Sequence, residues 1–362
     1  MNKFVSLSFA LTASTLTIGT APVYAANCNL DFSQMFVFGD SLSDPGNTDG
    51  VTIKEPGLYF EGRASNGYVF ADILAESCLG LDPVNFYRPH RGGMSSDGAN
   101  FAKGGSNSGD NLGKQLNSFL RDLEGQPANS NALYTLWIGS IDYLFGTKDY
   151  ITGNSPDIVD TTVENVIDGI QDLYDVGARN FPIPNLLSFT NSAFIDFQTT
   201  DDNMFDEIFN QLTDDHNQKL ELKIAEFEEK FSEVTITLLD VNSTFDNILE
   251  NPDEFGFSNV EDSWLECDDK FRCAVNQIAD PDGNLSDGYL YWDYIHPTTK
   301  FHQLIANEAI SALNSEYNQV VSEYNQAVPE PTSTLSLLGL GLSFLGTSAF
   351  KQKDIQKQKQ KV

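Results

Sequence analysis

Short apolar runs alternate with longer amphipathic segments through most of the chain. The apolar runs are typical of buried strands, and we expect strands at residues 35–38, 99–102, 132–138, 179–184 and 234–241. Apolar residues at helical spacing predict helices, at residues 68–76, 112–123, 156–176, 201–231 and 298–313. Strands alternating with helices predict an α/β sandwich with a mainly parallel sheet. Because no linker or internal repeat interrupts residues 26–325, we expect one domain there.

The N-terminal residues 1–25 have the pattern of a secretory signal peptide. A basic residue, Lys3, precedes an apolar stretch from Phe4 to Ile18, and the small residue Ala25 ends the segment. We expect cleavage after Ala25, with Ala26 as the alternative. The protein is therefore predicted to be exported, which makes disulfides permissible.

The C-terminal residues 326–362 have three parts. A Pro-Glu-Pro sequence at 329–331 precedes an apolar stretch at 335–350, and a lysine-rich end follows. This arrangement resembles the bacterial PEP-CTERM sorting signal, which implies sorting and processing machinery as a partner. The resemblance predicts a periplasmic, cell-surface or extracellular bacterial protein. A permanent transmembrane anchor is the alternative, although the apolar stretch is slightly short for a full span.

The chain is strongly acidic, with 52 Asp and Glu against 21 Lys and Arg and a net charge of −31. A surface of this sign repels nucleic acid, so we expect no nucleic-acid partner. Solubility is the favoured reason for the acidity, and binding of divalent cations is the alternative. Four cysteines allow three pairings, of which we favour Cys267–Cys273 and Cys28–Cys78. No C-x-x-C pair is present, which argues against a zinc site.

A serine and a histidine stand where nucleophilic catalysis would need them. Ser41 follows the first predicted strand, and parallel sheets place their sites at such strand ends. A hydroxyl needs an adjacent base to become a nucleophile. Of the four histidines, His296 follows Asp293 by three residues, so one loop can deliver an imidazole and an orienting carboxylate together. Each motif alone is weak, since Gly-Asp-Ser also makes ordinary turns and an Asp can simply cap a helix.

In combination, four segments resemble the conserved blocks of the GDSL family of SGNH hydrolases, in the family's order. They are Phe38–Asp44, Gly98–Gly105, Trp137–Tyr143 and Asp293–His296. The resemblance implies a three-layer, flavodoxin-like α/β/α fold and hydrolysis of carboxylic esters through an acyl-enzyme. It also implies Ser41 as nucleophile, His296 as base and Asp293 as the orienting acid. This chemistry needs no metal and no organic cofactor.

The resemblance further implies an oxyanion hole with three donors. They are the backbone N–H of Ser41, that of a second-block glycine, and an asparagine side chain. We assign the glycine as Gly105, with Gly104 as the alternative. At the asparagine position this chain has Ile141, which carries no side-chain donor. Ser140 stands beside it, but in an extended segment its side chain would point away.

Two hypotheses for function follow. The first is an exported serine hydrolase that cleaves lipid, acyl or acetyl esters, slowed by Ile141. The second is a catalytically weakened GDSL domain that binds at the surface or in the extracellular matrix. The acyl chain length, the alcohol and the oligomeric state are not predicted by the sequence.

Overall fold

A computed structural model describes residues 30–48, 58–82, 94–188, 203–267, 273–275 and 288–327. The predicted signal peptide, Cys28, His90 and the apolar stretch at 335–350 lie outside these residues. Residues 1–316 form one compact unit and residues 317–362 a second. In the described part of the chain, no helix is both long and apolar enough to cross a membrane.

Five parallel strands form the central sheet, in the order β2-β1-β3-β4-β5. They are β1 (Gln34–Gly39), β2 (Gly98–Asn100), β3 (Ala132–Trp137), β4 (Asn180–Pro184) and β5 (Thr235–Leu239). Each predicted strand is present within two residues of its expected bounds. Side chains alternate across β1: Met35 and Val37 enter one core, while Phe36 and Phe38 enter the other.

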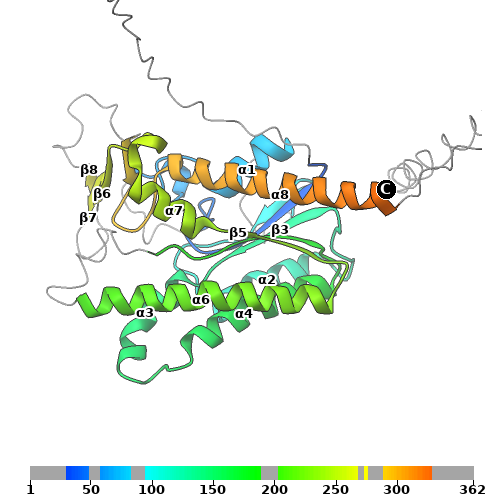
Figure 1. Cartoon of the computed structure of the whole chain (residues 1–362), viewed down its shortest axis with the longest axis horizontal. Coiled ribbons are helices and arrows are strands. Elements are labelled where there is room, and N and C mark those ends of the chain that lie inside the picture. The colour runs from blue at the N-terminus through cyan, green and yellow to red at the C-terminus, as the bar shows by residue number, and fades with distance from the viewer. Residues whose placement is uncertain are drawn as a thin grey trace, which may run out of the picture. The chain divides into compact units, whose positions relative to one another are not determined.

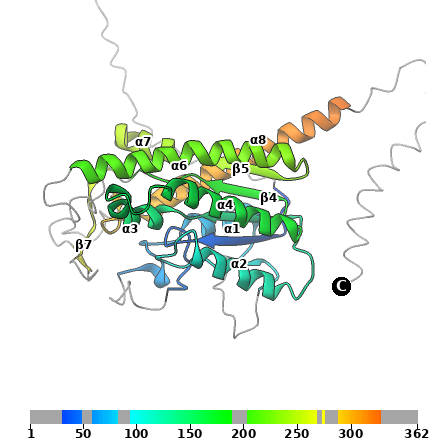
Figure 2. The same ribbon diagram turned by 90° about the horizontal axis from the view of Figure 1, so that it is seen from below.

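Helices cover both faces of this sheet (Figure 1). On one face lie α1 (Phe70–Leu79), α7 (Val241–Glu250) and α8 (Thr299–Ala327). On the other lie α2 (Asp110–Asp122), α3 (Ser140–Ile151), α4 (Ile158–Asp175) and α6 (Asn203–Lys230). Figure 2 shows α6 running alongside α4 and α3. The fold is thus the three-layer α/β/α sandwich predicted from the sequence, with a wholly parallel central sheet.

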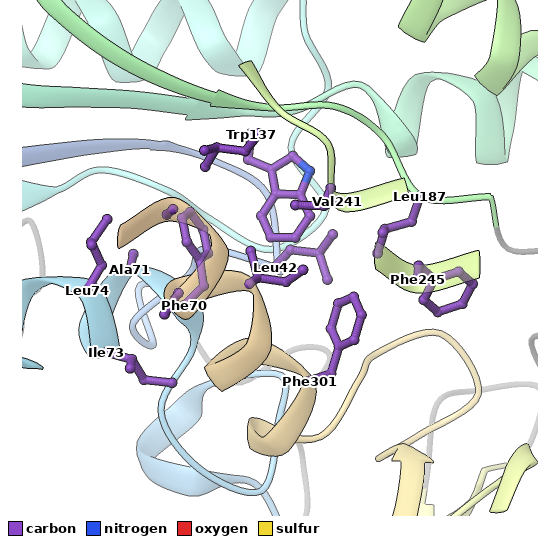
Figure 3. Close-up of a cluster of buried hydrophobic side chains, with 14 of the residues drawn as sticks. Leu42, Phe70, Ala71, Ile73, Leu74, Trp137, Leu187, Val241, Phe245 and Phe301 are labelled. Carbon is purple, nitrogen blue, oxygen red and sulfur yellow. The ribbon is translucent and has the colours of Figure 1, made fainter. Parts of the chain in front are cut away.

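The core between the sheet and α1, α7 and α8 anchors the segment that carries Ser41. Leu42 is buried there among Trp137, Phe70 and Phe301 (Figure 3). The rings of Phe70 and Trp137 meet edge to face with centroids 5.0 Å apart, an arrangement that aromatic pairs prefer. Burial of Leu42 therefore fixes the backbone on one side of the serine.

Small elements between β5 and α8 were not expected from the sequence. The strand β7 (Leu265–Cys267) pairs antiparallel with β8 (Cys273–Val275). Cys267 and Cys273 are opposite each other in this register. A parallel pair, β6 (Asn259–Ser263) and β9 (Tyr289–Tyr291), precedes the loop of Asp293 and His296.

Candidate active site

The turn after β1 presents Ser41 at the carboxyl edge of the sheet. Gly39 ends the strand, and a Cβ there would lie 2.5 Å from the carbonyl oxygen of Trp137, so a glycine is required. The side chain of Gln115 on α2 donates to the Gly39 carbonyl at 2.8 Å and accepts from its N–H at 2.9 Å. The next turn is closed by Asp40, whose Oδ1 accepts the N–H of Leu42 at 3.0 Å. These contacts hold the backbone on both sides of Ser41.

The structure brings Ser41, His296 and Asp293 together from opposite ends of the sequence. His296 Nε2 lies 2.8 Å from Ser41 Oγ. Its Nδ1 lies 2.8 and 2.9 Å from the two carboxylate oxygens of Asp293. An Nδ1–H that donates to a carboxylate leaves the Nε2 lone pair directed at the serine hydroxyl. This is the tautomer that can accept a proton from Ser41.

The loop itself orients the acid. Asp293 Oδ1 accepts the backbone N–H groups of Ile295 and His296, at 3.0 and 2.9 Å. Burial alone would raise the pKa of Asp293. The charge and hydrogen bond of His296, with the Ile295 N–H, nevertheless hold that pKa below its ordinary value. Asp293 is therefore ionised at neutral pH although its side chain is almost fully buried.

The carboxylate of Asp293 in turn raises the pKa of His296. Burial disfavours the charged imidazole, but the charge and hydrogen bond of Asp293, together with the charge of Asp40, hold the pKa of His296 above its ordinary value. Asp40 itself is buried, and burial is the main reason that its pKa rises to about 7. The charges of Asp142 and Asp44 raise it further, while the Leu42 N–H and His296 oppose the rise.

The other described histidines do not face the serine. His216 and His302 are both buried, and burial lowers the pKa of each to about 3. His216 contacts the hydroxyl of Tyr143 at 2.8 Å, within the core between α3 and α6. His296 is thus the histidine in contact with Ser41 in the described chain. Within those same residues, no three His, Cys, Asp or Glu side chains gather to hold a metal ion.

The two candidate glycines of the oxyanion hole differ in what their N–H groups do. The Gly104 N–H donates to Asp44 Oδ2 and to Thr48 Oγ1, at 2.8 Å in both cases. Neither the Gly105 N–H nor the Ser41 N–H is bonded to another described residue. Gly105 has a φ of +76°, which favours glycine, and it lines the cavity that contains Ser41 and His296. The geometry therefore favours Gly105 as a donor.

Ser140 and Ile141 are the first two residues of α3, and this corrects the expectation of an extended segment there. Gly139 supplies the turn into the helix with a φ of +129°. Backbone N–H groups in a first helical turn have no intrahelical acceptor and carry partial positive charge. Ile141 lines the cavity beside Ser41, whereas Ser140 Oγ is buried and has no hydrogen-bond partner within the described chain. No side-chain donor thus stands at the position of the family's asparagine.

A cavity of about 100 Å³ opens directly above these groups. Its walls are mainly apolar, and they include Ala64, Ile141, Leu144, Phe145 and Ile295. A wider groove of about 640 Å³ adjoins it along Gly105, Ile141 and Phe145, between α3 and the start of α4. Phe145 is 64% exposed at this junction. A small substrate group can therefore reach Ser41 while a larger one extends into the groove.

The sequence did not predict one polar contact to the carboxylate of Asp293. Tyr59 donates its hydroxyl to Asp293 Oδ2 at 2.8 Å, across a sequence separation of 234 residues. It lies inside a stretch, residues 45–67, whose Gly, Pro, Asn and Asp content indicates only a long loop. No periodicity or motif in that stretch singles out the tyrosine.

Comparison with known proteins places these features in a family. The family model described as GDSL-like Lipase/Acylhydrolase matches residues 35–309. GDSL esterase/lipase 4 of Arabidopsis thaliana is 26% identical over 361 residues, which cover 84% of this chain and 93% of that protein. GDSL esterase/lipase 2 of the same plant is 29% identical over 325 residues, which cover 76% of this chain and 84% of that protein.

Among solved structures, an acetylxylan esterase from Geobacillus stearothermophilus aligns with a TM-score of 0.41 at 10% identity. That alignment covers 78% of this chain and 95% of the esterase. The family match includes all five strands of the sheet and the segments of Ser41, Asp293 and His296. The chain belongs to the GDSL-like lipase/acylhydrolase family and is a carboxylic ester hydrolase.

Proposed function

We propose that Ser41 is the nucleophile, His296 the general base and Asp293 the orienting acid of an exported carboxylic ester hydrolase. The observation that supports this assignment is the continuous chain of hydrogen bonds from Ser41 Oγ to His296 and on to Asp293, each about 2.8 Å long. A base must lie within hydrogen-bonding distance of a hydroxyl to activate it as a nucleophile, and these distances meet that requirement.

In the first half of the reaction, His296 Nε2 takes the hydroxyl proton as Ser41 Oγ bonds to the ester carbonyl carbon. The resulting tetrahedral intermediate carries a negative oxygen, and the imidazolium is stabilised by Asp293. The intermediate collapses by breaking the bond to the alcohol oxygen, which takes the proton from His296. The acyl group stays on Ser41. In the second half, water attacks this acyl-enzyme with His296 again as base, so the acid is released and the serine is restored.

The negative oxygen needs fixed donors. The free N–H groups of Ser41 and Gly105 are the two donors that we assign. Ile141 supplies no third donor from its side chain, so this hole is weaker than one that includes an asparagine. We therefore propose a slow esterase, with the positive N-terminal end of α3 as partial compensation.

The substrate is an ester whose reacting end carries no negative charge. The described residues that line the cavity at Ser41 include the carboxylates of Asp44 and Asp293 but no Lys or Arg. The net charge of −31 adds repulsion of anions over the whole surface. Mainly apolar walls next to the serine suit a hydrocarbon or acetyl group. Lipid, acyl or acetyl esters of neutral alcohols are consistent with these features.

The alternative function is binding by a catalytically weakened domain, and the observation that favours it is Ile141 in place of asparagine.

We also propose three features from the sequence: export by a signal peptide, sorting through the C-terminal segment, and disulfides Cys28–Cys78 and Cys267–Cys273. The register of β7 and β8 supports the second pairing, because it sets the two residues opposite each other.

The deciding experiment is hydrolysis of p-nitrophenyl acetate by the wild type and by Ser41→Ala. We expect wild-type turnover above the buffer rate and a loss of about three orders of magnitude or more in the variant. Equal rates in the two proteins would exclude Ser41 as nucleophile. No turnover in either protein, on a panel of short and long acyl esters, would favour the binding function.

A further inference from the structure

A segment that is distant in sequence from the loop of Asp293 contacts the carboxylate of this residue. We call residues 58–68 the brace. Its Tyr59 donates to Asp293, as do the imidazole and two backbone N–H groups within the acid's own loop. Those two bonds go to Oδ1, and the bond from Tyr59 goes to Oδ2. Tyr59 therefore fixes the second oxygen, which also faces His296 Nδ1.

The brace is a stiff piece of structure despite its loop-like composition. Arg63 binds Asp72 at the start of α1 with two hydrogen bonds, from Nε at 2.7 Å and from Nη2 at 3.1 Å. Both side chains are buried, and the guanidinium also lies over the rings of Phe60 and Tyr68, at 5.6 and 5.1 Å from their centroids. Paired, stacked and buried arginine of this kind leaves the backbone little freedom.

The brace is also bonded to the chain that follows His296. Ser65 Oγ donates to the Pro297 carbonyl at 3.0 Å. The Thr299 N–H donates to Asn66 Oδ1, and Thr299 Oγ1 donates to the Tyr68 carbonyl, both at 2.8 Å. These bonds set the distance between Tyr59 and the loop of Asp293, so the hydroxyl is held against the carboxylate in advance of substrate binding.

We propose that Tyr59 is a positioning residue of the triad, which fixes the plane of the Asp293 carboxylate and so directs the imidazole of His296 at Ser41. This inference rests on the proposed catalytic roles of those three residues. Tyr59 does not touch the reacting atoms; it acts through Asp293. Burial and the neighbouring charge of Asp293 raise the pKa of Tyr59 above its ordinary value, so the hydroxyl keeps its proton throughout the working pH range.

Removing the hydroxyl has a consequence with a definite sign. Asp293 in Tyr59→Phe keeps its charge but loses the donor on Oδ2, so more negative charge is directed at the imidazole. The pKa of His296 should rise, because a bare carboxylate stabilises the imidazolium more strongly. The other titratable groups around the pair are Asp40, Asp44, Tyr294 and His302, and the substitution replaces none of them.

The experiment compares wild type, Tyr59→Phe and Tyr289→Phe in the full-length protein. Tyr289 is the matched control, because it packs in the same aromatic cluster, on Trp264, without contacting Asp293. One readout is the pH profile of p-nitrophenyl acetate hydrolysis. The second is the NMR titration of the His296 imidazole, assigned with His296→Asn, which needs no activity. Thermal unfolding monitors the fold of each variant.

For Tyr59→Phe we expect kcat to fall about tenfold, as for loss of one hydrogen bond to a charged group, with KM within twofold. The titration midpoint of His296 should move to higher pH, and Tyr289→Phe should match the wild type in both readouts. An unchanged His296 titration in a folded Tyr59→Phe protein overturns the positioning role, whatever the activity. A wild type that hydrolyses no ester overturns the proposed function instead, and the titration still decides the role of Tyr59.

Discussion

The position of Ile141 allows the catalytic power of the oxyanion hole to be tested by adding a group rather than removing one. Ile141 is the second residue of α3, it is half-buried, and its side chain lines the cavity shared by Ser41, Gly105 and His296. The perturbation is Ile141→Asn, which places an amide donor at the family's usual position. The control is Ile141→Leu, which has nearly the shape of asparagine and no donor.

The magnitude follows from the donors already present. A single side-chain donor in such a hole is typically worth about 10²–10³ in turnover. Here the Ser41 and Gly105 N–H groups remain, so the new amide adds to two donors already present. We therefore expect a rise of about tenfold to a hundredfold in kcat, equivalent to about 1.4–2.7 kcal/mol of transition-state stabilisation.

The assay is steady-state hydrolysis of p-nitrophenyl acetate, with kcat and KM determined separately. The gain should lie in kcat, because the donor meets charge that develops only in the transition state. Ile141→Leu should stay within threefold of the wild type. If the asparagine variant is no faster than the leucine variant while remaining folded, then the missing donor does not limit this enzyme, and our account of a slow esterase is wrong.

Three further predictions follow from groups around the site. Because His296 must be neutral to act as base and its pKa is raised, kcat/KM should climb with pH through a midpoint above the ordinary histidine value of about 6.5; a midpoint well below that value in a pH–rate profile would contradict the Asp293–His296 pair. Burial raises the pKa of Asp40 to about 7 in the folded protein, so ionisation of Asp40 destabilises the fold between the pKa of the unfolded chain and about pH 7. Asp40→Asn removes this ionisation, so the unfolding free energy of the variant minus that of the wild type should increase by up to about a few kcal/mol from pH 4 to pH 8. Urea titrations that give the same difference at both pH values would refute this. Arg63→Ala leaves the buried Asp72 without its partner and should lower stability by about 3–5 kcal/mol in the same assay, whereas a loss below 1 kcal/mol would mean that the ion pair does not hold the brace.

The sheet and most of its helices could be predicted because their patterns are long and regular. Residues 132–138 are apolar except for Thr135, and α4 carries a clear apolar face. The helices α3 and α7 were missed for a local reason. At most two residues separate each helix from the strand before it, so its first turn merged with the strand's apolar pattern, and α3 also contains Gly146 in its middle.

Sequence motifs predicted some residues of the site, whereas others could be identified only from contacts between distant parts of the fold. Ser41, His296 and Asp293 stand in recognisable spacings, and the fold brings them within hydrogen-bonding distance. The choice between Gly104 and Gly105 had no solution in the sequence, because it depends on Asp44 and Thr48 occupying one N–H and not the other. Tyr59 could not be found in the sequence for a related reason: its contact with Asp293 joins residues 234 positions apart, and no motif marks the tyrosine.

The most direct test of the central claim is mass spectrometry of the protein after treatment with a fluorophosphonate, which labels serines only when a neighbouring base activates them. Ser41 and His296 are in contact in the structure. The account predicts one adduct per chain, located on the peptide that contains Ser41, and its loss in His296→Ala. Labelling at another serine, or no labelling in a preparation that hydrolyses esters, would contradict the assignment of Ser41 as the activated nucleophile.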